Sequence, residues 1–182
     1  GRHYRDRLLK RWGEVDVKDC AAAAQSLIDA GKADKERVAI EGGSAGGFTT
    51  LACLCFTDVF NVGACRYAVS NLSSLVKETH RFEARYLDGL IGSWPEKESI
   101  YLDRSPLFNA KQINCPVIFF QGLKDKVVPA NQTNKIVNEL RKNKVPVEMH
   151  RFKNEGHGFR DSKVNVKVLE ETERFFRKHL NL

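Results

Sequence analysis

The sequence predicts an α/β fold with a parallel sheet, because short apolar runs typical of buried strands alternate along it with helix-compatible segments. Strands are predicted over 38–41, 62–69, 116–121 and 145–152. Helices are predicted over 15–30, 45–57, 130–143 and 163–180. The run at 62–69 is almost continuously apolar, as a strand covered on both faces should be. We therefore expect one mainly parallel sheet of about four strands, flanked by helices on both faces.

The composition is that of an ordinary globular protein and argues against membrane and nucleic-acid partners. The 182 residues are 42% hydrophobic and 29% charged, which suits one domain with a buried core. No apolar run reaches the length of about 18 residues that indicates a membrane-spanning helix. The net charge is +7, but the lysines and arginines are scattered and no nucleic-acid-binding motif is recognised. We therefore expect neither a membrane nor a nucleic-acid partner.

The cysteines indicate a reducing compartment. They are odd in number and form no Cys-x-x-Cys pair, and each lies in an apolar helix or strand stretch. Free buried thiols in a cytoplasmic protein are the best account of this pattern. No cysteine–histidine spacing typical of a metal site occurs, so neither a metal nor another cofactor is predicted.

A glycine-rich turn stands between the strand predicted at 38–41 and the helix predicted at 45–57. It reads Gly42-Gly43-Ser44-Ala45-Gly46-Gly47, and this strand–turn–helix context is what the Gly-x-Ser-x-Gly nucleophile elbow requires. Glycines two positions either side of Ser44 are expected to let the backbones approach without a Cβ clash. The start of the following helix offers N–H groups to an oxyanion. A glycine turn with an incidental serine is the alternative interpretation.

An acid and a base occur at the places where a parallel sheet would bring them to Ser44. Functional groups of such sheets lie in loops beyond the carboxyl ends of the strands. Asp125 follows the strand at 116–121, and His157 follows the strand at 145–152. The order Ser44, Asp125, His157 is that of an α/β-hydrolase triad. Other loop acids fit the position less well, namely Asp58, Asp103, Glu155 and Asp161, as do the remaining histidines, His3, His80, His150 and His179.

The three residue types suit nucleophilic catalysis. A serine hydroxyl becomes a good nucleophile when an imidazole takes its proton. The imidazole accepts and returns that proton near neutral pH, and a carboxylate fixes its tautomer. Each residue also has a plainer interpretation, with Asp125 paired to a neighbouring lysine and His157 a turn histidine.

At this point the sequence resembles the catalytic domain of the prolyl oligopeptidase family of serine peptidases, nearest its acylaminoacyl-peptidase and dipeptidyl-peptidase-like members. The resemblance runs nearly end to end. It is carried by Arg11-Trp-Gly-Glu-Val-Asp16, Glu41-Gly-Gly-Ser-Ala-Gly-Gly47, Glu83-Ala-Arg-Tyr-Leu87, Ser105-Pro106, Gln121-Gly-Leu-Lys-Asp125 and Glu155-Gly-His-Gly-Phe159.

The resemblance implies that short peptides are hydrolysed through an acyl-enzyme. It makes Ser44 the nucleophile, Asp125 the orienting acid and His157 the base. The segment after the strand at 62–69 resembles the region that lines the pocket for the residue before the scissile bond. Leu72, Leu75 and Tyr86 are the pocket candidates, although apolar residues there also suit a core.

The chain departs from the family pattern at its N-terminus. The family's catalytic domains bring several strands before the segment that matches Gly1–Arg11, together with a β-propeller, so 1–182 is expected to be one N-terminally incomplete domain. Only the backbone N–H of Ala45 is then available to an oxyanion, since an early loop supplies the second donor. The strand at 38–41 would be an open edge. We therefore expect this piece alone to be poorly active and prone to form a homodimer or to aggregate.

Two alternatives stay open. An esterase or lipase of the same fold would use the same triad, because its chemistry does not distinguish an ester from an amide. An inactive truncated module with a role in protein interaction is the other alternative.

Overall fold

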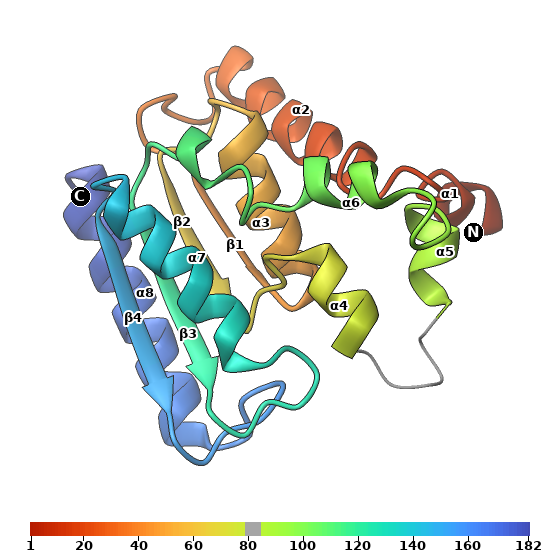
Figure 1. Ribbon diagram of the computed structural model, residues 1–182. Coiled ribbons are helices and arrows are strands. Elements are labelled where there is room, and N and C mark those ends of the chain that lie inside the picture. The colour runs from red at the N-terminus through yellow and green to blue at the C-terminus, as the bar shows by residue number, and fades with distance from the viewer. Residues whose placement is uncertain (79–84) are drawn as a thin grey trace.

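The computed structural model describes residues 1–78 and 85–182 (Figure 1). The sequence also offers His80 and Glu83 as residues that could line a pocket, and both lie outside the described residues. The sequence further indicates a helix over 82–90, and part of that range lies outside the described residues. Its described portion contains helix α5, Tyr86–Leu90.

One parallel sheet of four strands organises the described chain, in the order β1-β2-β3-β4. The strands are β1 (Ala39–Gly43), β2 (Val62–Arg66), β3 (Val117–Gly122) and β4 (Val147–Phe152). This confirms the predicted strand number and direction. Because all four run the same way, the loops that carry chemistry leave the sheet at one edge, below the arrowheads in Figure 1.

Two predicted strands are longer than the observed ones. The apolar run at 62–69 leaves the sheet after Arg66, because Tyr67 has a left-handed backbone with φ of 39°. Residue 146 is a proline, which has no N–H to donate to a ladder, and β4 begins after it. Periodicity alone does not reveal either break.

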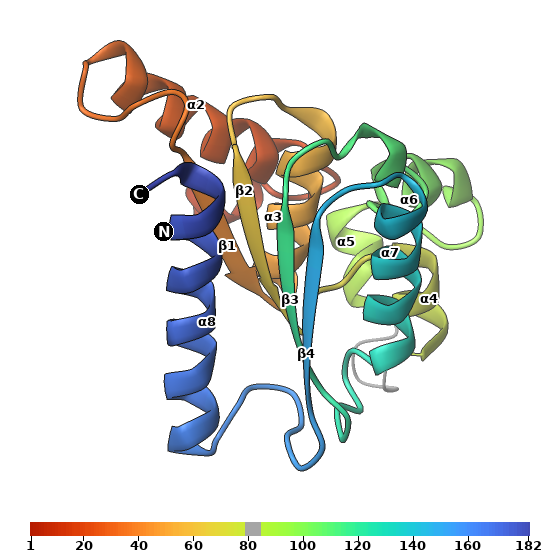
Figure 2. The same cartoon turned by 90° about the vertical axis from the view of Figure 1, so that its left-hand side faces the viewer.

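Helices cover both faces of the sheet, as predicted (Figure 2). Helix α3 (Ala45–Phe56) and helix α7 (Ala130–Lys142) pack on one face, and α8 (Ser162–Leu180) packs on the other. Helix α2 (Val15–Asp29) lies outside α3. The remaining short helices are α1 (Arg2–Asp6), α4 (Leu72–Glu78), α6 (Glu98–Arg104) and the 3-10 turn Ala110–Gln112.

Helix ends follow local sequence signals. The Asp161 carboxylate accepts a hydrogen bond from the N–H of Lys163 at 2.8 Å, which caps α8. Helix α2 ends just before Gly31, whose φ of 67° allows the chain to turn away. Among the described residues, no helix combines the length and apolar character needed to cross a membrane.

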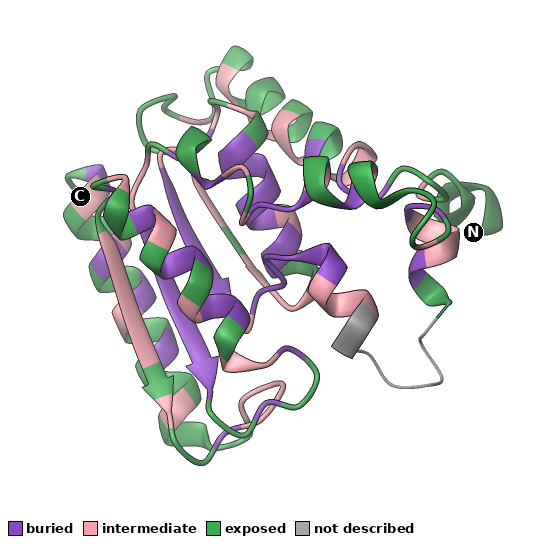
Figure 3. Cartoon of the chain, viewed as in Figure 1, coloured by how far each residue is buried: buried purple, intermediate pink, exposed green. Residues whose placement is uncertain are grey.

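Two apolar layers hold the sheet between its helices. Phe48, Leu51 and Phe119 belong to the layer under α3 and α7, and Phe120 and Phe175 to the layer under α8; all five are 0% exposed. Strands β2 and β3 are the buried centre of the sheet, whereas β4 is half-buried (Figure 3). Because β2 pairs with both β1 and β3 in this buried centre, the ends of β1 and β3 are held in fixed positions relative to each other. The loops that follow these two strands are therefore held as well.

Candidate active site

Ser44 occupies a sharp turn between β1 and α3. Its φ is 55°, which is unusual for a residue with a side chain. The Ser44 N–H donates to the carbonyl of Arg66 at 3.0 Å, and the Ser44 carbonyl accepts the N–H of Phe48 at 3.0 Å. The serine is therefore tied to the neighbouring strand on one side and to the first turn of α3 on the other. This is the strained strand-to-helix turn that a nucleophile elbow needs.

Close packing around the turn requires glycine at two positions. A Cβ at Gly42 would lie 2.8 Å from Thr50 Oγ1 and closer still to the Gly46 carbonyl. A Cβ at Gly47 would lie 2.6 Å from the Cβ of Ala68. A Cβ at Gly46 would meet no atom within 4 Å. The prediction that close packing requires a glycine two positions on either side of Ser44 is therefore wrong for Gly46. Gly42 and Gly47 are the required pair.

This difference gives a matched test of the turn. Gly42→Ala is expected to destabilise the protein by about 1–3 kcal/mol or more, because the new methyl overlaps backbone that cannot move freely. Gly46→Ala is expected to be neutral or stabilising by up to about 1 kcal/mol, because alanine is the better helix former. Urea unfolding of both variants measures the difference. Equal stabilities would contradict the steric account.

Asp125 lies in the loop between β3 and α7. Its Oδ1 accepts the N–H groups of Val127 and Val128, each at 2.9 Å. Its side chain is 0% exposed. The two backbone donors leave Oδ2 as the free oxygen of the carboxylate and fix the direction in which it points.

His157 joins Asp125 to Ser44. The His157 Nδ1 lies 2.9 Å from Asp125 Oδ2, and its Nε2 lies 2.8 Å from Ser44 Oγ. Both distances are those of good hydrogen bonds. With Nδ1 protonated toward the carboxylate, Nε2 has a lone pair for the serine proton. The structure thus brings together the three residues that the sequence predicts, from three different loops at one sheet edge.

The other loop acids lie elsewhere. Asp58 follows the far end of α3, Asp161 caps α8, and Asp103 is exposed on α6. Glu155 is close in sequence to His157, but its buried carboxylate accepts the N–H groups of Arg160 and Asp161. Glu155 therefore shapes the loop that carries the histidine, a role that sequence reasoning missed.

A second residue missed from sequence supports the Asp125 loop. Gln121 is 0% exposed at the end of β3. Its amide donates to the carbonyls of Gly122 and Val128 at 3.0 and 3.2 Å, and its Oε1 accepts the Thr133 hydroxyl at 2.7 Å. A polar residue within an otherwise apolar strand was the available signal.

Ala45 is the first residue of α3 and is exposed beside Ser44. Its N–H belongs to the first turn, where no intrahelical acceptor exists, so it can face an oxyanion. The predicted pocket residues are less uniform. Leu72 is buried in the core and Leu75 packs against it, whereas Tyr86 is 65% exposed. Their role in a substrate pocket stays a prediction.

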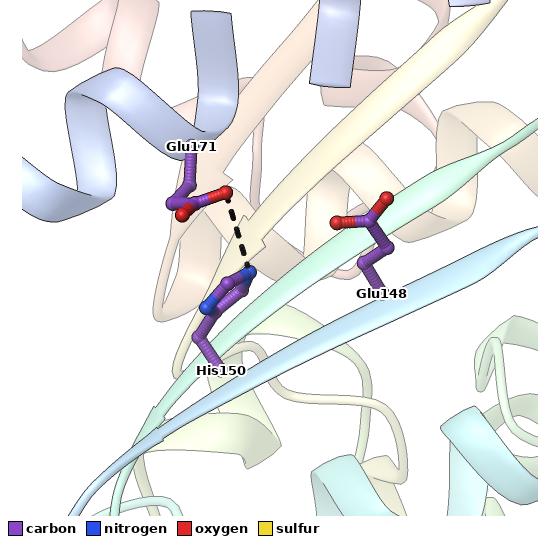
Figure 4. A group of neighbouring side chains, drawn as sticks. All are labelled: Glu148, His150 and Glu171. Atoms are coloured by element: carbon purple, nitrogen blue, oxygen red, sulfur yellow. Dashed lines mark ion pairs between the residues drawn. The ribbon is translucent and has the colours of Figure 1, made fainter. Parts of the chain in front are cut away.

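A separate group of possible metal ligands lies between β4 and α8, namely Glu148, His150 and Glu171 (Figure 4). Burial lowers the pKa of His150, which favours the neutral imidazole that metals bind. However, the Arg174 guanidinium bonds both carboxylates, and Lys178 lies 3.6 Å from Glu148. The two cations already neutralise the two acids, so the group is explained as an ion-pair network.

Helices on both faces of a parallel sheet, with a serine elbow, an acid and a histidine at its carboxyl edge, define the α/β-hydrolase class, as predicted. Within that class the chain belongs to the prolyl oligopeptidase family, whose sequence profile matches residues 1–182.

The chain is similar to proteins named as peptidases and as an acylamino-acid-releasing enzyme. The chain is 32% identical over 154 residues to dipeptidyl aminopeptidase BIII of Pseudoxanthomonas mexicana, covering 81% of this chain and 22% of that protein. It is 32% identical over 153 residues to the acylamino-acid-releasing enzyme of Arabidopsis thaliana, covering 80% and 20%. Among solved structures, a puromycin-hydrolyzing peptidase of Mycobacterium tuberculosis superposes with a TM-score of 0.96 at 47% identity, covering 99% of this chain and 27% of that one.

The chain thus spans only about a fifth of the length of these two curated relatives. It spans just over a quarter of the solved structures, since it covers 28% of a puromycin hydrolase that it matches with a TM-score of 0.97 at 42% identity.

Proposed function

We propose that this chain carries the nucleophilic centre of a serine peptidase that hydrolyses short peptides through an acyl-enzyme. The observation that carries the proposal is the pair of hydrogen bonds at His157, whose Nε2 accepts the Ser44 hydroxyl at 2.8 Å and whose Nδ1 donates to Asp125 at 2.9 Å. Membership of a peptidase family supports the choice of a peptide substrate.

In the proposed reaction, Ser44 Oγ attacks the peptide carbonyl carbon while His157 Nε2 takes the hydroxyl proton. Asp125 keeps the imidazole oriented and stabilises its positive charge. The Ala45 N–H donates to the oxyanion of the tetrahedral intermediate. Collapse of that intermediate breaks the C–N bond, and His157 returns the proton to the leaving amine. Water then attacks the ester on Ser44 by the same route, which releases the acid and restores the serine.

The same groups would hydrolyse an ester, so the substrate class needs its own experiment. Matched peptide and ester substrates with one acyl group should be compared on the full-length protein. We expect turnover of both, because the acylation chemistry is shared. Turnover of the ester alone would favour the esterase or lipase alternative. Turnover of neither, without labelling of Ser44, would favour the non-catalytic interaction module.

An open side of the fold supports a second proposal, that the 182-residue chain alone forms a homodimer. Within the described residues β1 pairs with β2 alone, so its other edge offers unpaired N–H and C=O groups. Exposed apolar residues lie on α8 and just beyond its last residue, Leu180. Val166 and Leu169 on the helix and Leu182 after it are 53%, 65% and 62% exposed.

The side of α8 on which Leu169 lies follows from the helical period. Arg174 and Lys178 contact Glu148 of β4, whereas Leu169 lies about 140° around the helix from Arg174, away from that strand. Phe176, on the Leu169 side, packs in the same cluster as Ala39 of β1. We infer that the apolar side of α8 lies toward the β1 edge of the sheet rather than toward β4.

We expect the 182-residue chain to show concentration-dependent dimerisation in light scattering coupled to size-exclusion chromatography. Leu169→Glu should weaken the dimer, because it places a charge within the apolar side of α8. Glu170→Gln, an exposed change one residue further along, is the matched control and should leave it intact. A monomer at all concentrations would contradict the proposal.

The same chain is expected to turn over substrate more slowly than the full-length protein, and equal rates would contradict that expectation.

A further inference from the structure

Tyr67 has a backbone conformation that its side chain disfavours. It follows β2 directly, with φ of 39°. An aromatic residue in the left-handed region costs free energy, and such outliers cluster at functional sites. The surrounding hydrogen bonds hold the conformation. The Tyr67 N–H donates to the Phe120 carbonyl at 2.8 Å, and the preceding carbonyl, of Arg66, accepts the N–H of Ser44 at 3.0 Å.

This backbone turn places the Tyr67 ring between the serine strand and the histidine loop. On one side the ring lies against Gly43, where a Cβ would meet the ring carbon Cε2 at 3.0 Å and the hydroxyl oxygen at 3.2 Å. On the other side its centroid lies 4.8 Å from that of the His157 ring, with the planes tilted by 58°. Tyr67 therefore touches the residue before Ser44 and the imidazole itself.

The contact with His157 continues as an aromatic chain. The Tyr67 ring meets Phe159 edge-on at 5.1 Å and 83°, and Phe159 meets Phe152 of β4 at 5.1 Å. These are favourable edge-to-face arrangements. The chain of rings links the end of β2 to the loop that carries the histidine and to the strand before it.

The imidazole needs such a support. His157 stands between two glycines, one of them with φ of 80°, and its side chain is 24% exposed. Its bonds to Asp125 and Ser44 leave from the two ring nitrogens, and such bonds lie close to the ring plane. They resist a tilt of the ring out of that plane only weakly. A ring packed against the imidazole resists it directly.

We propose that Tyr67 is a positioning residue that holds the His157 imidazole in line between Asp125 and Ser44. The inference rests on the proposed function, because it assigns Tyr67 to the support of its base. The aromatic ring is the part of the side chain that supports the imidazole, because it is rigid and presents a large surface for contact. The hydroxyl is not required for it.

Two substitutions separate the ring from the hydroxyl. Tyr67→Phe keeps the ring, and Tyr67→Leu removes it, while both keep a Cβ and so bear the same backbone conformation. In the full-length protein we expect kcat of Tyr67→Phe to stay close to that of wild type. For Tyr67→Leu we expect kcat to fall by about ten- to a hundredfold, the cost of a misplaced reacting group, with little change in KM. The rate of Ser44 labelling by a fluorophosphonate should fall in parallel.

A stability control distinguishes positioning from packing. Phe175 is 0% exposed under α8 and pairs with His179, away from the elbow. Phe175→Leu should lower the urea midpoint as Tyr67→Leu does, but leave kcat of the folded protein unchanged. If kcat falls equally in both variants, or if Tyr67→Leu retains wild-type kcat and labelling, the positioning role is overturned.

Failure of this inference is distinguishable from failure of the proposed function. Wild-type protein that is labelled at Ser44, with Tyr67→Leu labelled equally fast, overturns the role of Tyr67 alone. Folded wild-type protein that is neither labelled nor active overturns both.

Discussion

Replacement of Ser44 by alanine is expected to abolish peptide turnover and all labelling by a fluorophosphonate probe. The hydroxyl oxygen forms the acyl-enzyme in the proposed reaction, and alanine has no group that could take its place 2.8 Å from His157 Nε2. In an unrelated serine protease the loss of the nucleophile lowers kcat by about 10⁶-fold. The measurement is intact-protein mass after reaction with the probe, together with peptide turnover by the full-length protein.

The substitution should change activity without unfolding the chain. The Ser44 backbone bonds to Arg66 and Phe48 survive in Ser44→Ala, and φ of 55° is equally unusual for either residue. Ser26→Ala, an exposed change on α2, is the matched control and should keep full labelling. A labelled Ser44→Ala protein would contradict the assignment of the nucleophile.

Sequence predicted the parts of this site that depend on strand order. A parallel sheet brings the loops after its strands to one edge, so Asp125 and His157 could be found by locating the strands at 116–121 and 145–152. In the structure His157 lies 2.8 Å from Ser44 and 2.9 Å from Asp125. Locating Asp125 and His157 in this way did not require the exact ends of the strands.

Sequence did not predict what depends on close packing. Nothing in the order of residues indicates that Gly42 is pressed against Thr50 while Gly46 faces open space. The left-handed turn at Tyr67 is likewise hidden, because the apolar run continues through 69 as if the strand did. Both features arise from contacts between segments far apart in the chain, and no local pattern encodes such contacts.

The second large effect is expected from Asp125→Asn, which should lower kcat severely while leaving KM nearly unchanged. The Asp125 side chain is 0% exposed, so it contacts no substrate and acts only through His157. In a serine protease of another fold, the equivalent change lowers kcat by about 10⁴-fold.

The hydrogen bonds around Asp125 explain why the amide fails. Oδ1 accepts two backbone N–H groups, from Val127 and Val128, so the amide oxygen must take that position. The NH₂ group then faces His157 Nδ1, which has to accept a hydrogen bond instead of donating one. The imidazole proton moves to Nε2 in that tautomer, and Nε2 can no longer take the proton of Ser44.

The opposite orientation of the amide group is also unfavourable. With its oxygen toward His157, the NH₂ would face two buried N–H donors and leave them without an acceptor, which costs about 1–3 kcal/mol for each group. The wrong tautomer is therefore the preferred state of the variant. Asp103→Asn, an exposed change on α6, is the control and should retain wild-type kcat. If Asp125→Asn kept wild-type kcat, Asp125 would not orient the base, and the loop acid that does so would have to be sought elsewhere.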